Sequence, residues 1–412
     1  MTGYPLIECL CCGSNELRKV LDLGEQPPAN SYSISKSEVL QKFPLGLNVC
    51  SKCWHAQLSY CVNREELFDN YSYVSGTSAT LSHFFSWFAK ALSRVMKPGA
   101  TVLELAANDG SLIREMKSVG LECVGIDPAV NIVKKAQAEG LPILCGYWPQ
   151  VGLQLDQNFD AIICMNVVAH VDDPLSFLVG CKQKLAPDGI IIVQPSQARM
   201  FENCEFDTIY HEHISFFNSN SIAHLAQRAG LKLVEAFLVK IHGDSPVYVL
   251  QHEDASMLTA IRPEFSIGDF MIDDDLATYE NRIMLFSKET YARFGERSNE
   301  IIHSLLRTVE EHLMSGFDVV FVGAAAKAMT VINAAGIKPQ FFVDESPLKI
   351  GLYAPGCNSL IEPLTAVKNL VKPTLFVMCA WNFRYELAEK LKLIGVPEGS
   401  KFFAYFPKPE VF

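Results

Sequence analysis

Val102-Leu-Glu-Leu-Ala-Ala-Asn-Asp-Gly110 is the stretch that decides the fold, because a short apolar strand carrying an acid leads directly into a turn and a helix. Strands and helices then alternate over Thr101–Leu105, Ser111–Val119, Glu122–Ile126, Asn131–Glu139, Ala161–Met165, Pro174–Leu185 and Ile190–Val193. The strands are continuous apolar runs, as in a parallel sheet buried on both faces. The pattern predicts a doubly wound, Rossmann-like α/β sheet, whose ligands bind at the carboxyl ends of the strands.

The flanking segments predict further domains in a chain of 412 residues. Residues 1 to about 70 are turn-rich and too few to bury a core of their own. An amphipathic helix is expected over 81–96, followed after the first sheet by a mainly helical stretch over 275–315. A second α/β unit is predicted with strands near Val319–Val322, Gln340–Val343, Thr374–Met378 and Phe402–Tyr405.

Composition excludes several classes of protein. Hydrophobic residues make up 49% of the chain and charged residues 20%, as in a well-packed globular protein. The net charge of −11 argues against nucleic acids and anionic membranes as partners. The first residues lack a signal-peptide pattern and no apolar run could span a membrane, so we expect a cytoplasmic protein with reduced cysteines.

The four cysteines Cys9, Cys12, Cys50 and Cys53 form two C-x2-C pairs, a spacing typical of a tetrahedral zinc site. Cys11 falls outside that spacing and is expected to be a bystander. The alternative is that some of these residues are buried free thiols. Four sulfur ligands leave no open position for a substrate, so the predicted zinc ion is structural, and its binding free energy would help to fold the small module.

The first strand–turn–helix also suggests a cofactor. Glu104 lies near the end of the first strand, and Asp127 ends the next one, where an acid can accept both hydroxyls of a ribose. The turn lacks the G-x-G-x-x-G series, so a dinucleotide fits poorly, whereas a sulfonium nucleoside needs no pyrophosphate cradle. The alternative is an ordinary strand-to-helix turn in which Asp127 only caps the helix.

Two polar clusters follow later strands. Cys164-Met-Asn-Val-Val-Ala-His170 places Asn166 and His170 at the ligand edge, although a histidine there can equally be structural. Tyr210-His-Glu-His213 supplies four proton-handling groups in a row, and a histidine can remove a proton from a carbon next to a carbonyl. The alternatives are a second metal site, whose H-E-x-x-H spacing is absent, and an aromatic-rich core turn.

Val322-Gly-Ala-Ala-Ala-Lys327 ends a strand in the second unit and opens a helix, and Asp344 ends the next strand. The helix start could contact an anion or a nucleotide. With a single glycine, the loop is equally consistent with a Rossmann-like scaffold that binds no dinucleotide.

Taken together, these motifs resemble the three-domain, zinc-containing C-methyltransferases that act on nucleotide-linked keto-deoxysugars in antibiotic and surface-glycan pathways. The resemblance covers nearly the whole chain and is most specific in Asp207-Thr-Ile-Tyr-His-Glu-His213. It implies a class I methyltransferase domain, S-adenosylmethionine as donor, a zinc ion without a chemical role, and a substrate held between the middle and C-terminal domains. The domains are expected at 1–72 (zinc), 73–255 (methyltransferase) and 256–412 (second Rossmann-like unit, substrate binding).

The resemblance also implies roles for individual residues. His213 matches the family's proposed base, and neighbouring active-site positions match Tyr210, Glu212, His170 and a tyrosine of Tyr71-Ser-Tyr73, of which we favour Tyr73. The donor is expected to contact Glu104, Asn108, Asp109, Gly110, Asp127 and Asn166.

Three departures from the family pattern stand out. Ala106 replaces a common glycine and fits without strain only if its φ is negative. Val193-Gln-Pro-Ser196 lacks the acid of an E-x-P pattern, and His242-Gly-Asp-Ser-Pro246 lacks an arginine that could meet phosphate. The last two departures are expected beside the substrate.

The sequence therefore predicts C-methylation next to a keto group, at C3 of a nucleotide-linked 4-keto-deoxysugar, by a monomer or weak homo-oligomer. The alternatives are a methyltransferase of the same fold acting on another carbon acid, oxygen or nitrogen, and a non-catalytic zinc scaffold.

Overall fold

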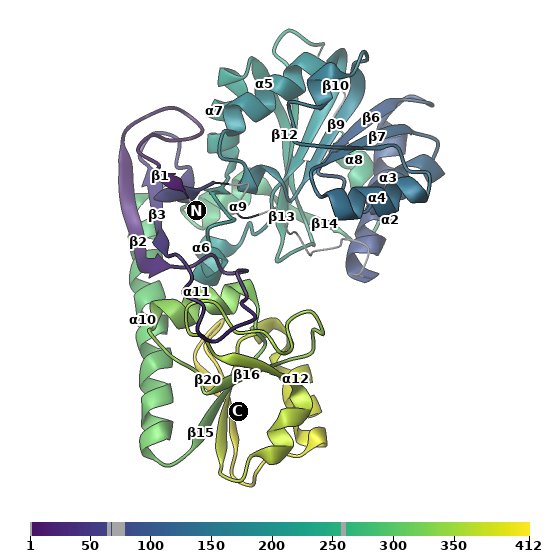
Figure 1. Ribbon diagram of the computed structural model, residues 1–412. Coiled ribbons are helices and arrows are strands. Elements are labelled where there is room, and N and C mark those ends of the chain that lie inside the picture. The colour runs from purple at the N-terminus through teal and green to yellow at the C-terminus, as the bar shows by residue number, and fades with distance from the viewer. Residues whose placement is uncertain (1, 64–66, 68–78, 257–260) are drawn as a thin grey trace.

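The protein is seen in a computed structural model that describes residues 2–63, 67, 79–256 and 261–412. Figure 1 shows an N-terminal module beside two larger α/β domains, one above the other. The fold is thus mixed α/β with two Rossmann-like sheets, as the sequence predicts. Tyr71 and Tyr73 lie outside the described residues.

The N-terminal module is more regular than the sequence indicates. Its four-stranded antiparallel sheet has the order β11-β4-β3-β2, and a small hairpin-like pair joins β1 to β5. The strands are β1 (Gly3–Pro5), β2 (Leu17–Gln26), β3 (Phe43–Cys50), β4 (Ala56–Leu58), β5 (Tyr60–Val62) and, from the middle domain, β11 (Ser215–Phe216). The strand donated by the middle domain shows why the module is not independent: part of its sheet comes from elsewhere in the chain.

The middle domain is built on an eight-stranded sheet of order β14-β12-β13-β10-β9-β6-β7-β8. The strands β6 to β10 are parallel, and the remaining three are antiparallel additions. Their bounds are β6 (Thr101–Leu105), β7 (Glu122–Asp127), β8 (Ile143–Cys145), β9 (Phe159–Met165), β10 (Leu185–Gln194), β12 (Leu231–Val239), β13 (Ser245–His252) and β14 (Met271–Asp275). Because β6 and β9 are central neighbours, the turns that follow them meet at one edge.

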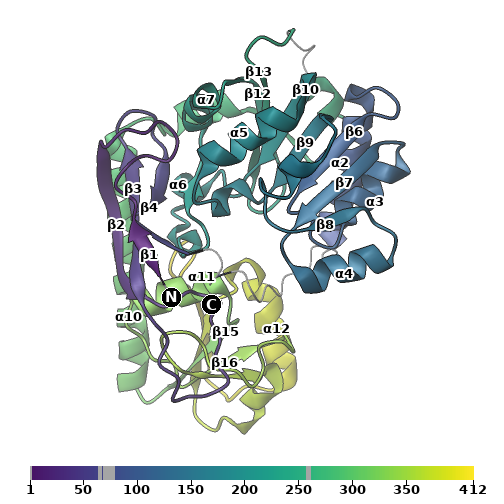
Figure 2. The same cartoon turned by 45° about the horizontal axis from the view of Figure 1, so that its top comes forward.

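Helices cover both faces of this sheet (Figures 1 and 2). The helices are α2 (Ala79–Val95), α3 (Ser111–Ser118), α4 (Val130–Ala138), α5 (Pro174–Lys184), α6 (Met200–Asn203), α7 (Ser219–Arg228) and α8 (Arg262–Phe265), with short 3-10 turns at Gly152–Gln154, Val168–His170 and Phe206–Thr208. Helix α2 buries an aromatic face against α3 and α8, which confirms the predicted amphipathic helix. No helix within the described residues is long and apolar enough to cross a bilayer.

The C-terminal domain follows two helices, α9 (Leu276–Arg282) and the long α10 (Lys288–Met314). Its sheet has the order β17-β16-β15-β18-β19-β20, parallel except for the last strand. The remaining elements are β15 (Asp318–Val322), α11 (Ala326–Ala334), β16 (Phe341–Asp344), β17 (Leu360–Pro363), β18 (Thr374–Met378), α12 (Arg384–Ile394), β19 (Lys401–Ala404) and β20 (Glu410–Val411), with 3-10 turns at Leu364–Asn369 and Trp381–Phe383.

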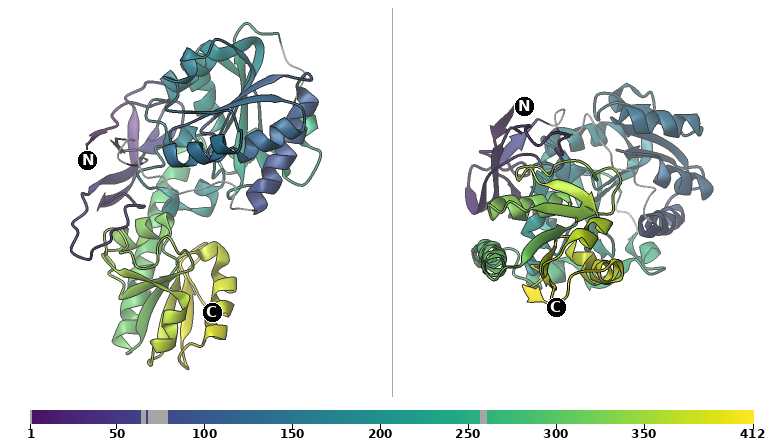
Figure 3. Two further views of the ribbon diagram at one scale, coloured as in Figure 1. Left: turned by 45° about the vertical axis from the view of Figure 1, so that its right-hand side comes forward. Right: turned by 60° about the horizontal axis from the view of Figure 1, so that its bottom comes forward.

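Helix α10 ties the parts together. It packs along β2 of the N-terminal module and against β15 of the C-terminal sheet (Figure 3). The approach is close at Gly295, where an added Cβ would lie 2.4 Å from the backbone oxygen of Val20. One hydrophobic cluster therefore runs without interruption from the N-terminal module through α10 into the C-terminal sheet. The turns after β6 and β9 share a cavity wall with residues of the N-terminal module and of the C-terminal domain.

Candidate active site

The two cysteine pairs converge on one metal site. The sulfur atoms of Cys9, Cys12, Cys50 and Cys53 all lie within 4.8 Å of one another. Cys9 Sγ is 3.4 Å from Cys53 Sγ, and Cys12 Sγ is 3.5 Å from Cys50 Sγ. Four thiolates around zinc at about 2.3 Å would lie roughly 3.8 Å apart, so the donor set fits a tetrahedral zinc ion. Cys11 is fully buried and stands outside this group.

Local turns shape both halves of the metal site in the same way. The amide of Cys12 donates to Cys9 Sγ at 3.5 Å, and the amide of Lys52 donates to Cys50 Sγ at 3.4 Å. The backbone oxygen of Trp54, just past the second pair, accepts from Asn218 Nδ2 and from the hydroxyl of Tyr291. The metal site therefore joins the N-terminal module to the middle domain and α10. None of the four cysteines lines a cavity described below.

The ends of β6 and β7 open onto a cavity of about 420 Å³. Its wall combines the carboxylates of Asp127, Asp172 and Asp173 with apolar and aromatic side chains, which include Trp148 and Phe177. Both oxygens of Asp127 accept backbone amides, from Asn108 at 2.8 Å and from Ala129 at 2.8 Å. Each oxygen keeps a further lone pair, so a ribose hydroxyl can still donate to it. The volume and the aromatic wall fit a nucleoside.

The turn after β6 has a left-handed backbone at alternate residues. The φ angles are +55° at Ala106, +49° at Asn108 and +73° at Gly110. Ala106 would be unstrained only at a negative φ, and its φ is positive. A Cβ at such an angle costs roughly 1–2 kcal/mol. Asparagine and glycine tolerate this region, but alanine does so less readily. Strain of this kind is concentrated at binding and catalytic loops.

Glu104 is the unsatisfied group of the site. Its side chain is buried, and Oε2 has no hydrogen-bond partner. Burial, followed by the nearby charges of Asp127 and Asp109, raises the pKa of Glu104 well above its ordinary value. An unpaired buried carboxyl is costly, and a cationic ligand group would relieve that cost. The amino group of S-adenosylmethionine is such a cation.

Other predicted donor contacts are divided between cavity and scaffold. Asn108 and Asn166 line the larger cavity, and Asn166 also lines the smaller one. Asp109 and Gly110 line neither, because Asp109 Oδ1 turns to the start of α3 and accepts the Ser111 hydroxyl at 2.7 Å. The structure therefore brings most of the predicted donor residues together and uses the other two to shape the turn.

A second cavity of about 800 Å³ adjoins the first. The two cavities share Ala106, Asp127, Asn166, Val167 and His170 on their walls. The larger one extends past these residues to Tyr210, Glu212 and His213. A donor in the first cavity and an acceptor in the second would therefore meet near His170.

His213 is held as a neutral imidazole with its lone pair on Nε2. Nδ1 donates to the backbone oxygen of Thr208 at 2.9 Å, and Nε2 accepts the hydroxyl of Tyr210 at 2.8 Å. Burial, followed by the charge of the neighbouring His170, lowers the pKa of His213 well below its ordinary value. The ring centroids of His213 and His170 are 5.0 Å apart. The group is thus unprotonated at neutral pH, as a base must be.

The other members of the cluster have distinct surroundings. His170 Nδ1 donates to the backbone oxygen of Glu212 at 2.7 Å, and burial lowers the pKa of His170. Glu212 accepts from Asn30 Nδ2 at 2.7 Å, while burial raises the pKa of the carboxyl. His211 is fully buried against Phe43. Within the described residues, the four cysteines are the only group of three or more His, Cys, Asp or Glu side chains placed closely enough to hold a metal ion. The structure therefore gives no support to a second metal site at Tyr210–His213.

Several residues on the wall of the larger cavity were not predicted from the sequence. Asn30 and Tyr32 reach the larger cavity from the N-terminal module, and Lys349 reaches it from the C-terminal domain. Lys349 Nζ and the Tyr32 hydroxyl both donate to the backbone oxygen of Ala324, at 2.9 Å and 2.6 Å. The only local signal was the Pro-rich turn before Asn30. Tyr73, predicted to join this site, lies outside the described residues.

Comparison with known proteins agrees with this geometry. Three family models match successive parts of the chain: “Putative zinc binding domain” over 9–68, “Methyltransferase domain” over 80–236 and “C-methyltransferase C-terminal domain” over 271–407. The C-methyltransferase NovU of Streptomyces niveus is 27% identical over 420 residues, covering 99% of this chain and 97% of NovU. This chain therefore has a zinc-binding module, a methyltransferase domain and a C-methyltransferase C-terminal domain in succession. It is accordingly an S-adenosylmethionine-dependent enzyme with a zinc-binding module.

The chain also has partial likenesses to other proteins. A ubiquinone biosynthesis O-methyltransferase of Xanthomonas campestris pv. campestris (strain B100) is 32% identical over 107 residues, or 24% of this chain and 45% of that protein. A TehB-like SAM-dependent methyltransferase from Corynebacterium glutamicum matches with a TM-score of 0.31 and 18% identity, covering 40% of this chain and 88% of that one. Neither likeness extends over the whole chain.

Proposed function

We propose that this C-methyltransferase methylates C3 of a nucleotide-linked 4-keto-deoxysugar, with His213 as the base. The observation that carries the proposal is the lone pair on Nε2 of His213, held against the Tyr210 hydroxyl in a cavity that adjoins the nucleoside-sized one. The likeness to NovU supports carbon as the methylated atom. The setting that follows is deoxysugar or antibiotic biosynthesis in the cytoplasm.

The pair of Tyr210 and His213 suits enolisation. His213 Nε2 takes the proton from the carbon next to the keto group, and the electrons of that C–H bond move to the keto oxygen. Protonation of Nε2 removes the acceptor of the Tyr210 hydroxyl, which is then available to donate to the enolate oxygen. Proton transfer by a placed base contributes typically about 10²–10⁴-fold. A donor aimed at the developing oxyanion adds stabilisation where the charge appears.

Residues at the junction of the two cavities would hold the methyl donor. Asp127, which lines both cavities, would accept the ribose hydroxyls, and the unpaired Oε2 of Glu104, on the wall of the larger cavity, would receive the ammonium group. Asn166 and His170 stand on the wall common to both cavities. When bound, S-adenosylmethionine supplies an electrophilic methyl group to the enolate carbon. The remaining steps belong to side chains of this chain.

A nucleotide-linked acceptor fits the outer part of the larger cavity. Lys349 is the one lysine on that wall, which has no arginine, among the residues that the structure describes. Burial lowers the pKa of Lys349, and the nearby charge of Asp344 partly offsets this effect. A bound phosphate would raise that pKa further by favouring the charged form of the lysine. Asn30 holds Glu212 in place, and Glu212 holds His170 through its backbone oxygen. Tyr73 remains part of the proposed catalytic set.

Deuterium exchange tests the base separately from methyl transfer. The enzyme is incubated in D₂O with S-adenosylhomocysteine and a thymidine diphosphate-linked 4-keto-6-deoxysugar, and the C3 proton is followed by NMR. We expect the wild-type enzyme to exchange that proton faster than buffer does, and His213→Asn to match the buffer rate. Labelled donor should then give a product heavier by one methyl group on carbon. Methylation without enzyme-dependent exchange would contradict the enolate route and favour an oxygen or nitrogen acceptor.

A further inference from the structure

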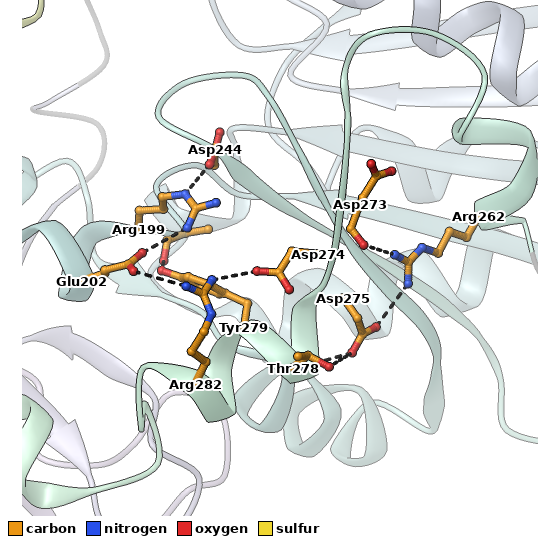
Figure 4. A network of polar contacts seen from close by, with 11 residues as sticks. Arg199, Glu202, Asp244, Arg262, Asp273, Asp274, Asp275, Thr278, Tyr279 and Arg282 are labelled. Carbon is orange, nitrogen blue, oxygen red and sulfur yellow. Dashed lines mark hydrogen bonds and ion pairs between the residues drawn. The ribbon is translucent and has the colours of Figure 1, made fainter.

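The segment just after one departure from the family pattern, Val193–Ser196, contacts the turn that carries the other, His242–Pro246. The amide of Ala198, just after the strand exit of β10, donates to the backbone oxygen of Asp244 at 2.8 Å. The guanidinium of Arg199 also forms an ion pair with the carboxylate of Asp244 (Figure 4). Segments that are about 45 residues apart in sequence are thus fastened by one backbone bond and one charged bond.

Arg199 is itself held from two further sides. It donates to Glu202 Oε2 at 3.0 Å, and its guanidinium carbon lies 4.9 Å from the centre of the Tyr279 ring. The Tyr279 hydroxyl donates to the backbone oxygen of Ala198 at 3.3 Å. Figure 4 shows Arg199 between Asp244 and Glu202, with Tyr279 alongside. The side chains of Arg199 and Asp244 are only 25% and 24% exposed, so solvent screens their attraction incompletely.

The pair fixes two strained residues that line the larger cavity. Gln197, next to Ala198, has φ of +71°, and the turn at 242–244 has φ of +52°, +75° and +62° in succession. Both Gln197 and His242 are on the cavity wall. Non-glycine residues at such angles cost roughly 1–3 kcal/mol each and persist only where the surroundings impose them. The Arg199–Asp244 pair supplies that constraint.

The same unit reaches the base. Gln197 Oε1 accepts the hydroxyl of Thr208. The backbone oxygen of Thr208 accepts from His213 Nδ1 at 2.9 Å, and its hydroxyl lies 3.2 Å from the same nitrogen. A shift of Gln197 would therefore displace Thr208, which is in direct contact with His213.

We propose that Arg199 and Asp244 are positioning residues that act together to fix Gln197 and His242 on the acceptor wall, and so set which acceptor is used. This inference deepens the proposed function and rests on it for the identity of the acceptor. The arginine that the resemblance implies in the 242–246 turn is absent, and here an arginine–aspartate pair holds the wall, which leaves Lys349, among the described residues of that wall, as the cation available to a phosphate.

The test compares Asp244→Asn with Asp274→Asn. Asparagine tolerates the left-handed backbone at position 244, so the substitution removes the charge with little added strain. Asp274 belongs to the same network and is the matched control, because its ion pair is with Arg282, at 2.7 Å, and not with the 242–246 turn. We expect Asp244→Asn to raise the KM for the keto-sugar nucleotide about five-fold or more, since small misplacements of binding groups are costly.

Other parameters should separate positioning from general damage. The kcat should change less than about three-fold, because the Thr208 backbone oxygen still holds His213. Donor affinity by calorimetry should be unchanged, and Asp274→Asn should leave all values near wild type. The double variant Arg199→Met/Asp244→Asn should be no worse than the poorer single variant, because residues that act as one unit are not additive. Equal KM values for Asp244→Asn and Asp274→Asn would overturn the proposal.

A readout without acceptor distinguishes this inference from the proposed function. If the wild-type enzyme does not methylate the keto-sugar, the proposed function fails, while hydrogen exchange at the Ala198 amide still judges the pair. That amide should exchange faster in Asp244→Asn than in Asp274→Asn, since it donates to the 244 backbone oxygen. Unchanged exchange would contradict the clamp whatever the substrate proves to be.

Discussion

The two Rossmann-like units of this chain use the same acid in the same way, with different consequences. In the middle domain, Asp127 at the end of β7 accepts the amide of Asn108 from the turn after β6 and the amide of Ala129 two residues on. In the C-terminal domain, Asp344 at the end of β16 accepts the amide of Ala324 from the turn after β15, and that of Ser346 two residues on, each at 2.7 Å. The acid therefore braces the preceding turn in both units.

What lies beyond the turn differs. Past Asp127 are two adjoining cavities of about 420 and 800 Å³. Past Asp344, Tyr32 and Lys349 both bond to the backbone oxygen of Ala324, and an added Cβ at Gly323 would lie 2.9 Å from the Cβ of Ala380. Lys327 pairs with the buried Asp207 at 4.0 Å. A strand-ending acid is thus evidence for a braced turn, and only the surrounding domains decide whether a ligand can enter.

The largest effect should come from the base, which belongs to the open unit. We expect His213→Asn to lower turnover by about 10²–10⁴-fold while donor affinity stays near wild type. The pKa of His213 is lowered, so in the wild-type enzyme the acidic limb of kcat/KM should fall below pH 6.5, the ordinary histidine pKa. His224→Asn, on helix α7, is the control. Comparable activity in the two variants would break the assignment.

The two bracing acids offer the direct comparison. Asp127→Asn should weaken donor binding about 10- to 100-fold, because hydrogen bonds to a charged group contribute about 1.5–3 kcal/mol. Asp344→Asn should leave donor affinity within about two-fold. The midpoint temperature of thermal unfolding should fall in both variants, since each turn loses a charged acceptor of two amides. Donor binding lost equally in both would show that the second unit takes part in binding the donor.

Proton release on donor binding would show that the crevice of the middle domain, unlike that of the C-terminal domain, takes up a ligand. The raised pKa of Glu104 favours its protonated form in the free enzyme, and an ammonium ligand would lower that pKa. Donor binding should therefore release up to about one proton at a pH between the two values. Calorimetry in buffers of different ionisation enthalpy measures this release. Glu104→Gln should bind the donor more weakly and release none, and unchanged release would exclude Glu104 as the source.

The smallest effect concerns the backbone of the two turns. Ala106 has φ of +55°, whereas Ala325 in the corresponding turn has φ of −88°. Ala106→Gly should raise the free energy of unfolding by up to about 1 kcal/mol, since relief of left-handed strain exceeds the entropy lost by glycine. Ala325→Gly relieves no such strain, and because position 325 is the N-cap of α11, where glycine is tolerated, it should change that free energy by less than about 0.5 kcal/mol. Both differences are measured by denaturant unfolding, and a gain at position 106 no larger than that at 325 would refute the strain at Ala106.

Local patterns predicted four of the five parallel strands of the middle sheet, missing the short β8, but none of its antiparallel strands. The apolar runs of β6, β7 and β9 were predictable because buried parallel strands have a simple signature. Strands β12, β13 and β14 were missed, since antiparallel pairing between distant segments leaves no local period as clear. The N-terminal strands β2 and β3 were hidden by turn residues and by their dependence on α10. The domain limits at 72 and 255 remain predictions.

The sequence alone predicted the two cysteine pairs, the turn after β6 with Asp127, and the cluster of Tyr210, Glu212 and His213, because each motif is a matter of spacing within short segments. Only the tertiary structure decided that His213 lies beside His170, that Asn30 holds Glu212, and that Arg199 meets Asp244. These contacts join residues far apart in the chain, and their closeness follows from how strands pair and domains dock. No local pattern of side chains records that choice.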